Sequence, residues 1–268
     1  MNNISKYQGV SQFGSAYKTM LENDTHAPGS IDRVLTEGMI RLCPETMAYL
    51  YGGYTPTKSL YIKGSRPELE QYLDQMILVN HSKEEQIQEI MKFISNLQHK
   101  ISDDLDLIQF GGTEEEIIAR GSDWCTDLAR VGCVLCQIAG YPARVVHLFD
   151  LEKPYSGHEI VEVYRDKVWG AADPLRNVVY HNSKGEPVSA LDLMNDRQLI
   201  ENNYLNDQLT ALRAVGQFSG AAISNYYVWQ WKDHDYTVSK LNGYCRPILE
   251  NANQGWPGGL RWLHEEDR

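Results

Sequence analysis

The chain has 268 residues, of which 42% are hydrophobic and 23% are charged, and its formal net charge is −11. This length suffices for one large domain or two small ones with a stable core. The acidic balance disfavours nucleic acids and anionic membrane surfaces as partners, and no Lys/Arg cluster offsets it.

The N-terminus is polar and lacks an apolar run of signal-peptide length. No stretch approaches the roughly 18 consecutive apolar residues that a membrane span requires. The chain has five cysteines, an odd number that does not suggest a disulfide framework. We therefore expect a cytoplasmic protein with reduced thiols and no membrane association.

The N-terminal part predicts a polar arm followed by short elements. Residues 1–30 are polar, and apolar spacing over residues 31–44 predicts a short helix that Pro44 ends. A short strand is expected over residues 59–63. A helix is expected from Pro67 to about Leu78, because proline favours the first turn. A capping box and an apolar stripe at helical spacing predict another over residues 82–97.

A second capping box, Thr113 with Glu116, predicts a short helix that leads to Gly121. The three glutamates at 114–116 are expected to form a solvated first turn favoured by the helix dipole, rather than a metal site. Residues 123–139 form the clearest helical pattern, which Gly140 ends.

Strand patterns follow over residues 143–149, 158–164, 167–172 and 177–180. A clear helix followed by closely spaced strands predicts an α+β fold with an antiparallel sheet. Helical spacing resumes after about Ser189, and a further strand is expected over residues 226–231.

We predict one domain over residues 1–268. Within it, residues 1–109 form a mainly helical N-terminal elaboration, residues 110–180 form a catalytic core, and residues 181–268 contribute C-terminal helices and an aromatic-rich strand. The sequence shows no internal repeat, low-complexity tract or clear linker that would suggest a second domain.

A thiol, an imidazole and a carboxylate occur in the order typical of a cysteine nucleophile, its base and the group that orients the base. These are Cys125, His158 and Asp173. Cys125 is expected in the first turn of its helix, where unpaired N–H groups and the helix dipole can stabilise a thiolate or an oxyanion. Neighbouring strands would bring the carboxylate to the imidazole, since they lie about 4.8 Å apart.

Three motifs surround these residues. Cys125 is followed by Ala129 and by the run Gly140-x-Pro142-Ala143-Arg144; His158 opens His158-x-x-x-Glu162-Val163; and Asp173 closes Trp169-x-x-x-Asp173-Pro174. Together they resemble the core of the transglutaminase-like superfamily, a branch of the papain-like cysteine fold. The resemblance covers roughly residues 110–180.

The resemblance implies that Cys125 is the nucleophile, His158 the base and Asp173 its orienting carboxylate, with a thioester intermediate and no metal or other cofactor. It also implies a structural role for Arg144, in a buried ion pair. The sequence departs from the family pattern at Asp123, where glycine is frequent, and at Ile160, where an aromatic residue is frequent. Both changes would reshape the cleft without removing the chemistry.

Our first expectation is a cysteine-dependent hydrolase, an amidase or peptidase, that acts on a peptide, a protein or a small amide. The second is an acyltransferase, of transglutaminase type or amide-forming, that passes the acyl group to an amine. The third is a binding scaffold without catalytic activity. The core motifs do not decide between water and an amine as the acceptor.

Other residues have alternative interpretations. Trp124, Gly157 and Trp169 are candidates to line the cleft, although Trp124 could equally anchor its helix in the core. Cys133 and Cys136 are three apart on a helix, which favours core packing over a zinc or redox site. The aromatic residues of the 226–231 strand could line a groove, although strand packing is the more ordinary interpretation.

Overall fold

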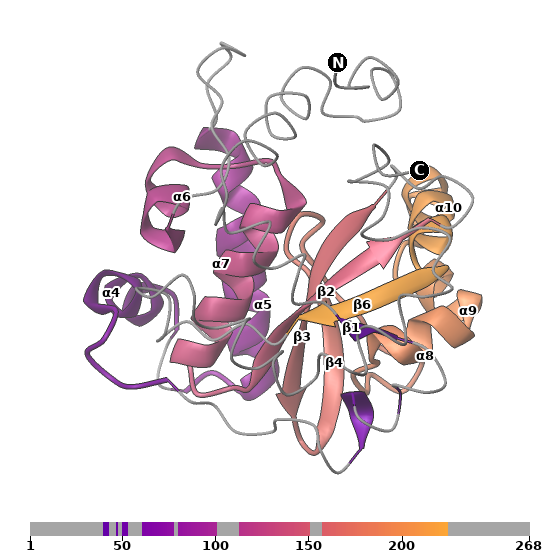
Figure 1. The fold of residues 1–268 in the computed structure, drawn as a ribbon, viewed down its shortest axis with the longest axis horizontal. Helices are drawn as coiled ribbons and strands as arrows, with labels where there is room; N and C mark the ends of the chain where they lie inside the picture. The colour runs from indigo at the N-terminus through magenta and orange to yellow at the C-terminus, as the bar shows by residue number, and fades with distance from the viewer. Residues whose placement is uncertain are drawn as a thin grey trace, which may run out of the picture.

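The computed structural model describes residues 40–42, 47, 50–52, 61–77, 80–100, 113–150 and 157–224. These residues form an antiparallel sheet with helices on both faces, which confirms the predicted α+β fold. In Figure 1, helices α4 to α7 lie on one side of the sheet and helices α8 to α10 on the other.

Within the described residues, the sheet has six strands in the order β1-β6-β2-β3-β4-β5, and all neighbours are antiparallel. Their bounds are β1 Ile40–Arg41, β2 Ala143–Phe149, β3 His158–Arg165, β4 Val168–Asp173, β5 Val178–Val179 and β6 Gly220–Ser224. Strand β6, the last one in the described part of the chain, returns to pair with β2, so that β2 and β3 lie in the middle.

Strands β3 and β4 form a hairpin that sets the position of the candidate site. Asp166 and Lys167 make its two-residue turn, and both have positive φ angles, as a tight turn between twisted strands requires. The register pairs Val161 with Ala172. The first residue of β3, His158, and the last residue of β4, Asp173, therefore come to the same end of the sheet.

On one face of the sheet lie α4 Pro67–Met76, α5 Lys83–Ser95, the 3-10 helix η2 Asn96–Lys100, α6 Glu114–Arg120 and α7 Cys125–Ile138. On the other lie α8 Ala190–Asn195, α9 Arg197–Asn202 and α10 Gln208–Gln217. Side chains alternate between the two cores: Val145 and Val161 pack against the α7 layer, whereas Val146 and Ile160 pack against the α8–α10 layer. Because both faces are covered, these strands are apolar at successive positions.

Local sequence signals account for most helix ends. The capping boxes of Ser82 with Glu85 and of Thr113 with Glu116 are both formed, as predicted. Helix α4 begins at Pro67, also as predicted, but its N-cap is Arg66 and no side chain caps it. Gly140, with φ +93°, follows the end of α7.

Some expected elements differ from the structure. Ile40–Arg41 is a strand paired with β6, not part of a helix, because this backbone satisfies its hydrogen bonds at the sheet edge. Residues 61–63 form no strand, since Lys63 begins a turn that leads to α4. C-terminal helices were expected in residues 181–268, but no bounds were predicted for α10, and strand β6 was not predicted. The expected 226–231 strand and the 1–30 arm lie outside the described residues, and the division into three regions stays a prediction.

Within the described part of the chain, every helix is too short or too polar to cross a membrane.

Two glycines with positive φ angles give a matched test of the packing before α7. A β-carbon on Gly121 would lie 2.5 Å from the carbonyl oxygen of Leu97, whereas one on Gly140 would meet nothing within 4 Å. We expect Gly140→Ala to lower the free energy of unfolding by about 1 kcal/mol, from backbone strain alone. Gly121→Ala adds a backbone clash and should cost roughly 3 kcal/mol or more. Urea unfolding measures both, and equal losses would contradict the close approach of η2 to Gly121.

Candidate active site

Cys125 is the first residue of α7, and the start of this helix differs from most of the others. Side-chain caps begin α5, α6, α8, α9 and α10, but the N-cap residue of α7 is Trp124, which provides none. The first intrahelical hydrogen bond runs from Leu128 N to Trp124 O. The amides of residues 125–127 therefore have no partner one turn earlier in the helix.

A side-chain network fixes the loop that presents Cys125. Ser122 Oγ accepts a hydrogen bond from Trp124 N at 3.2 Å and donates one to Asp127 Oδ2 at 3.0 Å. Arg120 Nη2 donates to the same carboxylate oxygen at 2.7 Å. Asp127 thereby ties the end of α6 and the loop to the first turn of α7.

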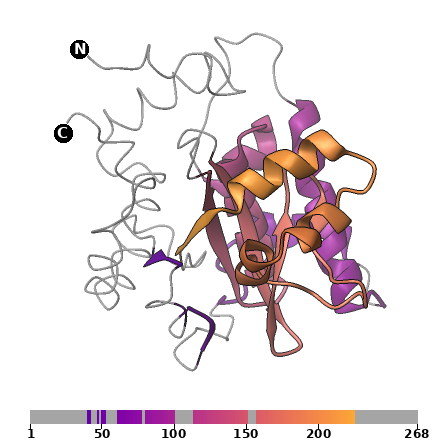
Figure 2. The same ribbon diagram turned by 90° about the vertical axis from the view of Figure 1, so that its right-hand side faces the viewer.

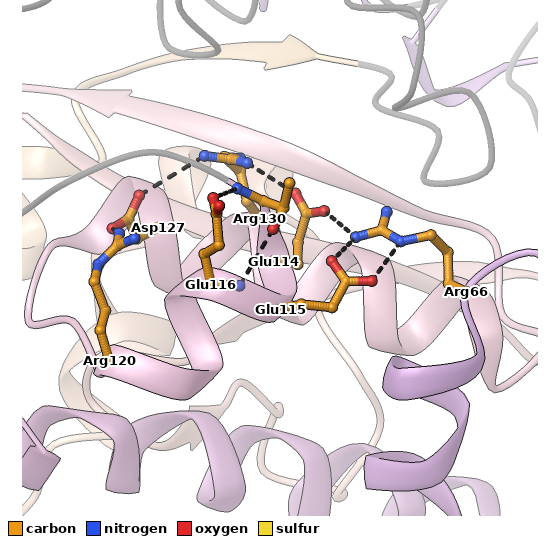
Figure 3. Close-up of polar contacts among 8 residues, drawn as sticks. Arg66, Glu114, Glu115, Glu116, Arg120, Asp127 and Arg130 are labelled. Atoms are coloured by element: carbon orange, nitrogen blue, oxygen red, sulfur yellow. Dashed lines mark hydrogen bonds and ion pairs between the residues drawn. The ribbon is translucent and has the colours of Figure 1, made fainter.

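This network continues into the helical layer (Figure 3). Arg130 lies 3.8 Å from Asp127 and 2.9 Å from Glu114, and Arg66 Nη2 reaches the second oxygen of Glu114 at 2.9 Å. Arg66 also pairs with Glu115. Glu114 is fully buried, so the expectation of a solvated glutamate was wrong at this position. The reason is that Arg66, the N-cap residue of α4, and Arg130, on α7, compensate its charge there.

The first turn of α6 gives the second test. Glu114→Gln leaves two buried guanidinium groups without their shared carboxylate, and we expect it to lower the free energy of unfolding by about 3–5 kcal/mol. Glu116→Gln, two residues away, should cost less than about 1 kcal/mol, because glutamine can keep the capping-box hydrogen bond. Denaturant unfolding of both variants measures the difference, and equal small losses would show that the network contributes little to stability.

The structure brings His158 and Asp173 together at the end of the sheet. Their Nε2 and Oδ2 atoms are 2.7 Å apart, and the residues are 2% and 0% exposed. The pair belongs to the hairpin β3–β4, so backbone pairing holds both residues in place. The predicted contact between the strand-opening histidine and the strand-closing aspartate is therefore present.

Arg176 supplies Asp173 with two further donors. Its Nη1 donates to Oδ2 at 3.0 Å, and its backbone N–H donates to Oδ1 at 3.1 Å. Burial alone would raise the pKa of Asp173, but the charges of His158 and Arg176, with these hydrogen bonds, lower it below its ordinary value. Asp173 is thus a carboxylate at neutral pH.

This charge state determines which nitrogen of His158 carries the proton. An ionised carboxylate can only accept, so Nε2 must donate to it. Burial, reinforced by the Arg176 charge, lowers the pKa of His158 despite the attraction of Asp173. The ring is therefore neutral at pH 7, and Nδ1 is the nitrogen left free to accept a proton.

The thiol of Cys125 lies beside the first residues of β3. The backbone N–H of Glu159, one residue along the strand from His158, is close enough to lower the pKa of the thiol. Among the contacts of the described residues, no hydrogen bond joins the Cys125 sulfur to the His158 ring. Burial and the Glu159 carboxylate raise the pKa of Cys125 to about 12, so the resting group is a thiol and not the expected thiolate. Burial outweighs the helix dipole because the residue is only 6% exposed.

The protonation state of Cys125 gives the third test. With a pKa of about 12, its alkylation by iodoacetamide should rise about tenfold per pH unit from pH 7 to 10, since only the thiolate reacts. An ordinary exposed cysteine, with a pKa near 8.5, levels off above about pH 9. Mass spectrometry of the peptide that contains Cys125 separates it from the other cysteines. A plateau already reached below pH 7 would mean a preformed thiolate–imidazolium pair.

Two residues of the site were not predicted. Arg176 Nη2 donates to Gln217 Oε1 at 2.7 Å, and Gln217 Nε2 donates to the carbonyl oxygen of Gly157 at 3.4 Å. Arg176 could have been found, because an aspartate often bonds the backbone N–H of a nearby turn residue. Gln217 lies on α10, forty-one positions after Arg176, and has no local signal.

The residues expected to line the cleft lie in different surroundings. Gly157 precedes His158 and contacts Gln217, and Trp124 is buried beside Cys125. Trp169 precedes Asp173 by four residues on β4, about 13 Å along the strand. The Arg144 guanidinium lies over the Trp169 ring, with its Cζ atom 3.9 Å from the ring centroid. We therefore assign Trp169 to the core around Arg144 and do not include it in the proposed site.

The predicted buried ion pair of Arg144 is present. Arg144 Nη2 lies 2.7 Å from Glu162 Oε2, and both side chains are almost fully buried. Cys133 and Cys136 are fully buried in the α7 core, in agreement with a packing role. The part of the chain that the structure describes contains no group of three or more His, Cys, Asp or Glu residues arranged to hold a metal ion.

Comparison with known proteins identifies one family. Residues 70–174 match the sequence profile of the transglutaminase-like superfamily. The match begins within α4 and covers α5 to α7 and strands β2 to β4, so it starts before the region in which the motifs were found. No curated protein and no solved structure matches the chain.

Proposed function

Because residues 70–174 form a transglutaminase-like superfamily core domain, we propose that the protein is a cysteine-dependent hydrolase of an amide bond, with Cys125, His158 and Asp173 as its catalytic residues. The observation that carries the proposal is the buried His158–Asp173 pair at 2.7 Å. It lies at the end of the sheet where the amide of the neighbouring residue, Glu159, is close enough to affect the pKa of Cys125.

The proposed reaction begins with a neutral thiol and a neutral imidazole. As Cys125 attacks the carbonyl carbon, His158 Nδ1 takes the thiol proton, and Asp173 stabilises the imidazolium that forms. The bond from sulfur to carbon forms while the carbonyl π electrons move to oxygen. First-turn amides of α7 are suited to stabilise this oxyanion, because no side chain caps them.

The tetrahedral intermediate then collapses. The C–N bond breaks, and His158 returns its proton to the leaving amine, which gives a thioester on Cys125. Water attacks the thioester with His158 again as the base, and the acid product and the free thiol are released. Every proton moves through one imidazole, whose orientation Asp173 maintains.

Acyl transfer to an amine is the second candidate, and one observation favours it. Cys125 and His158 are 6% and 2% exposed, so bulk water has little access to a thioester in this conformation. Exclusion of water protects reactive intermediates from hydrolysis. An amine that binds in the cleft could then compete with water.

The fourth test measures turnover and its products. The wild-type protein and Cys125→Ala are incubated with a panel of small amides and peptides, with and without a primary amine. Released amine, free acid and amine adduct are quantified by mass spectrometry. We expect amide cleavage that Cys125→Ala reduces by at least about 10³-fold, since the nucleophile is lost. Free acid should exceed adduct if water is the acceptor.

Asp173→Asn is the matched variant for the orienting role. It should lower kcat by roughly 10³–10⁴-fold, because the amide no longer favours the Nε2–H tautomer or stabilises the imidazolium. Adduct in excess of free acid would favour the acyltransferase. Turnover that Cys125→Ala leaves unchanged would contradict Cys125 as the nucleophile, whereas no turnover on any substrate of the panel would favour a binding scaffold.

A further inference from the structure

Helix α10 brings one more cation to the candidate site. Figure 2 shows α10 as the long orange helix that leads into β6 and lies beside the sheet. Its last residue, Gln217, is buried and bonds both Arg176 and the Gly157 carbonyl. Residues four apart share a helix face, so Arg213 lies on the same side of α10 as Gln217, about 6 Å earlier along the helix axis.

Arg213 differs from Arg176 at the site and from Arg197 on helix α9. Arg176 and Arg197 each pair with a carboxylate, Asp173 and Glu201 respectively. Within the described part of the chain, Arg213 has no carboxylate partner, and its side chain is exposed. An exposed guanidinium without an ion pair is available to bind an anion from outside the protein.

The electrostatics agree with this position. Partial burial and the charge of Arg176 lower the pKa of Arg213, while an ionised Cys125 raises it. The guanidinium therefore lies within the field of both the candidate nucleophile and Arg176. In a chain with a net charge of −11, a cation at this point favours the approach of an anionic substrate to the sulfur.

We propose that Arg213 is a substrate-binding residue, and that the protein acts on amides that carry a carboxylate near the scissile bond. This inference rests on the proposed function, since it places the carboxylate relative to Cys125. The planar guanidinium can bind a carboxylate through two parallel hydrogen bonds. Arg213 would then hold the substrate from the α10 side while the α7 amides hold the reacting carbonyl.

The test compares two alkylating agents that differ by one charge. The Cys125 thiolate displaces iodide from both iodoacetate, an anion, and iodoacetamide, which is neutral. The ratio of the two rate constants at one pH reports how well the site accepts a carboxylate, because the thiolate fraction cancels. It is measured at pH 9 and low salt by mass spectrometry of the peptide that contains Cys125.

Three variants make the measurement specific. Arg213→Gln should lower the iodoacetate-to-iodoacetamide ratio about fivefold, the effect of one charge near the sulfur at an intermediate dielectric. Arg213→Lys keeps the charge and should stay within about twofold of the wild type. Arg197→Gln, which removes an exposed charge on α9, is the control and should leave the ratio unchanged. The Arg213→Gln effect should shrink in 1 M salt.

An unchanged ratio in Arg213→Gln would overturn the inference, as would an equal fall in Arg197→Gln, which would mean a general charge effect. The alkylation ratio requires no turnover. An Arg213-dependent ratio in a protein without amide turnover would therefore contradict the proposed function and leave the anion site standing. Amide turnover together with an unchanged ratio in Arg213→Gln would support the proposed function and overturn the anion site.

Discussion

A buried carboxylate remains ionised only if enough donors compensate for its lost hydration, and Asp173 has three of them. His158 and two groups of Arg176 donate to it at 2.7–3.1 Å. The rest of the proposed chemistry depends on this arrangement. An ionised Asp173 makes His158 Nε2 a donor, which leaves Nδ1 as the base. Burial lowers the pKa of His158, and the charge of Arg176 adds to this effect, so the resting histidine is neutral.

Two separate parts of the fold meet at this end of the sheet. The β3–β4 hairpin brings the histidine and the aspartate together through backbone pairing. The helical layer presents the cysteine through ion pairs that join α4, α6 and α7. Buried ion pairs add little net stability, but removing one partner is costly. The network therefore specifies where α7 begins more than it stabilises the fold, and the first residue of α7 is Cys125.

The sequence predicted those features that local chemistry determines. Capping boxes, the glycine after α7 and the alternating strands gave the helices and strands of the core, and motif spacing indicated His158 and Asp173. Features that depend on distant residues were missed. The burial of Glu114 requires Arg66 and Arg130 from other helices, and Gln217 reaches the site only because β6 returns to pair with β2. The raised pKa of Cys125 depends on how deeply its thiol is buried, which the helix-start pattern alone does not specify.

The most direct test of the account is the protonation pattern of the His158 ring, measured by long-range ¹H–¹⁵N NMR at pH 7 and assigned by comparison with His158→Gln. The account predicts a neutral ring with the proton on Nε2 and none on Nδ1. A proton on Nδ1, whether in the other neutral tautomer or in an imidazolium, would contradict it, because no free nitrogen would then remain to accept the thiol proton.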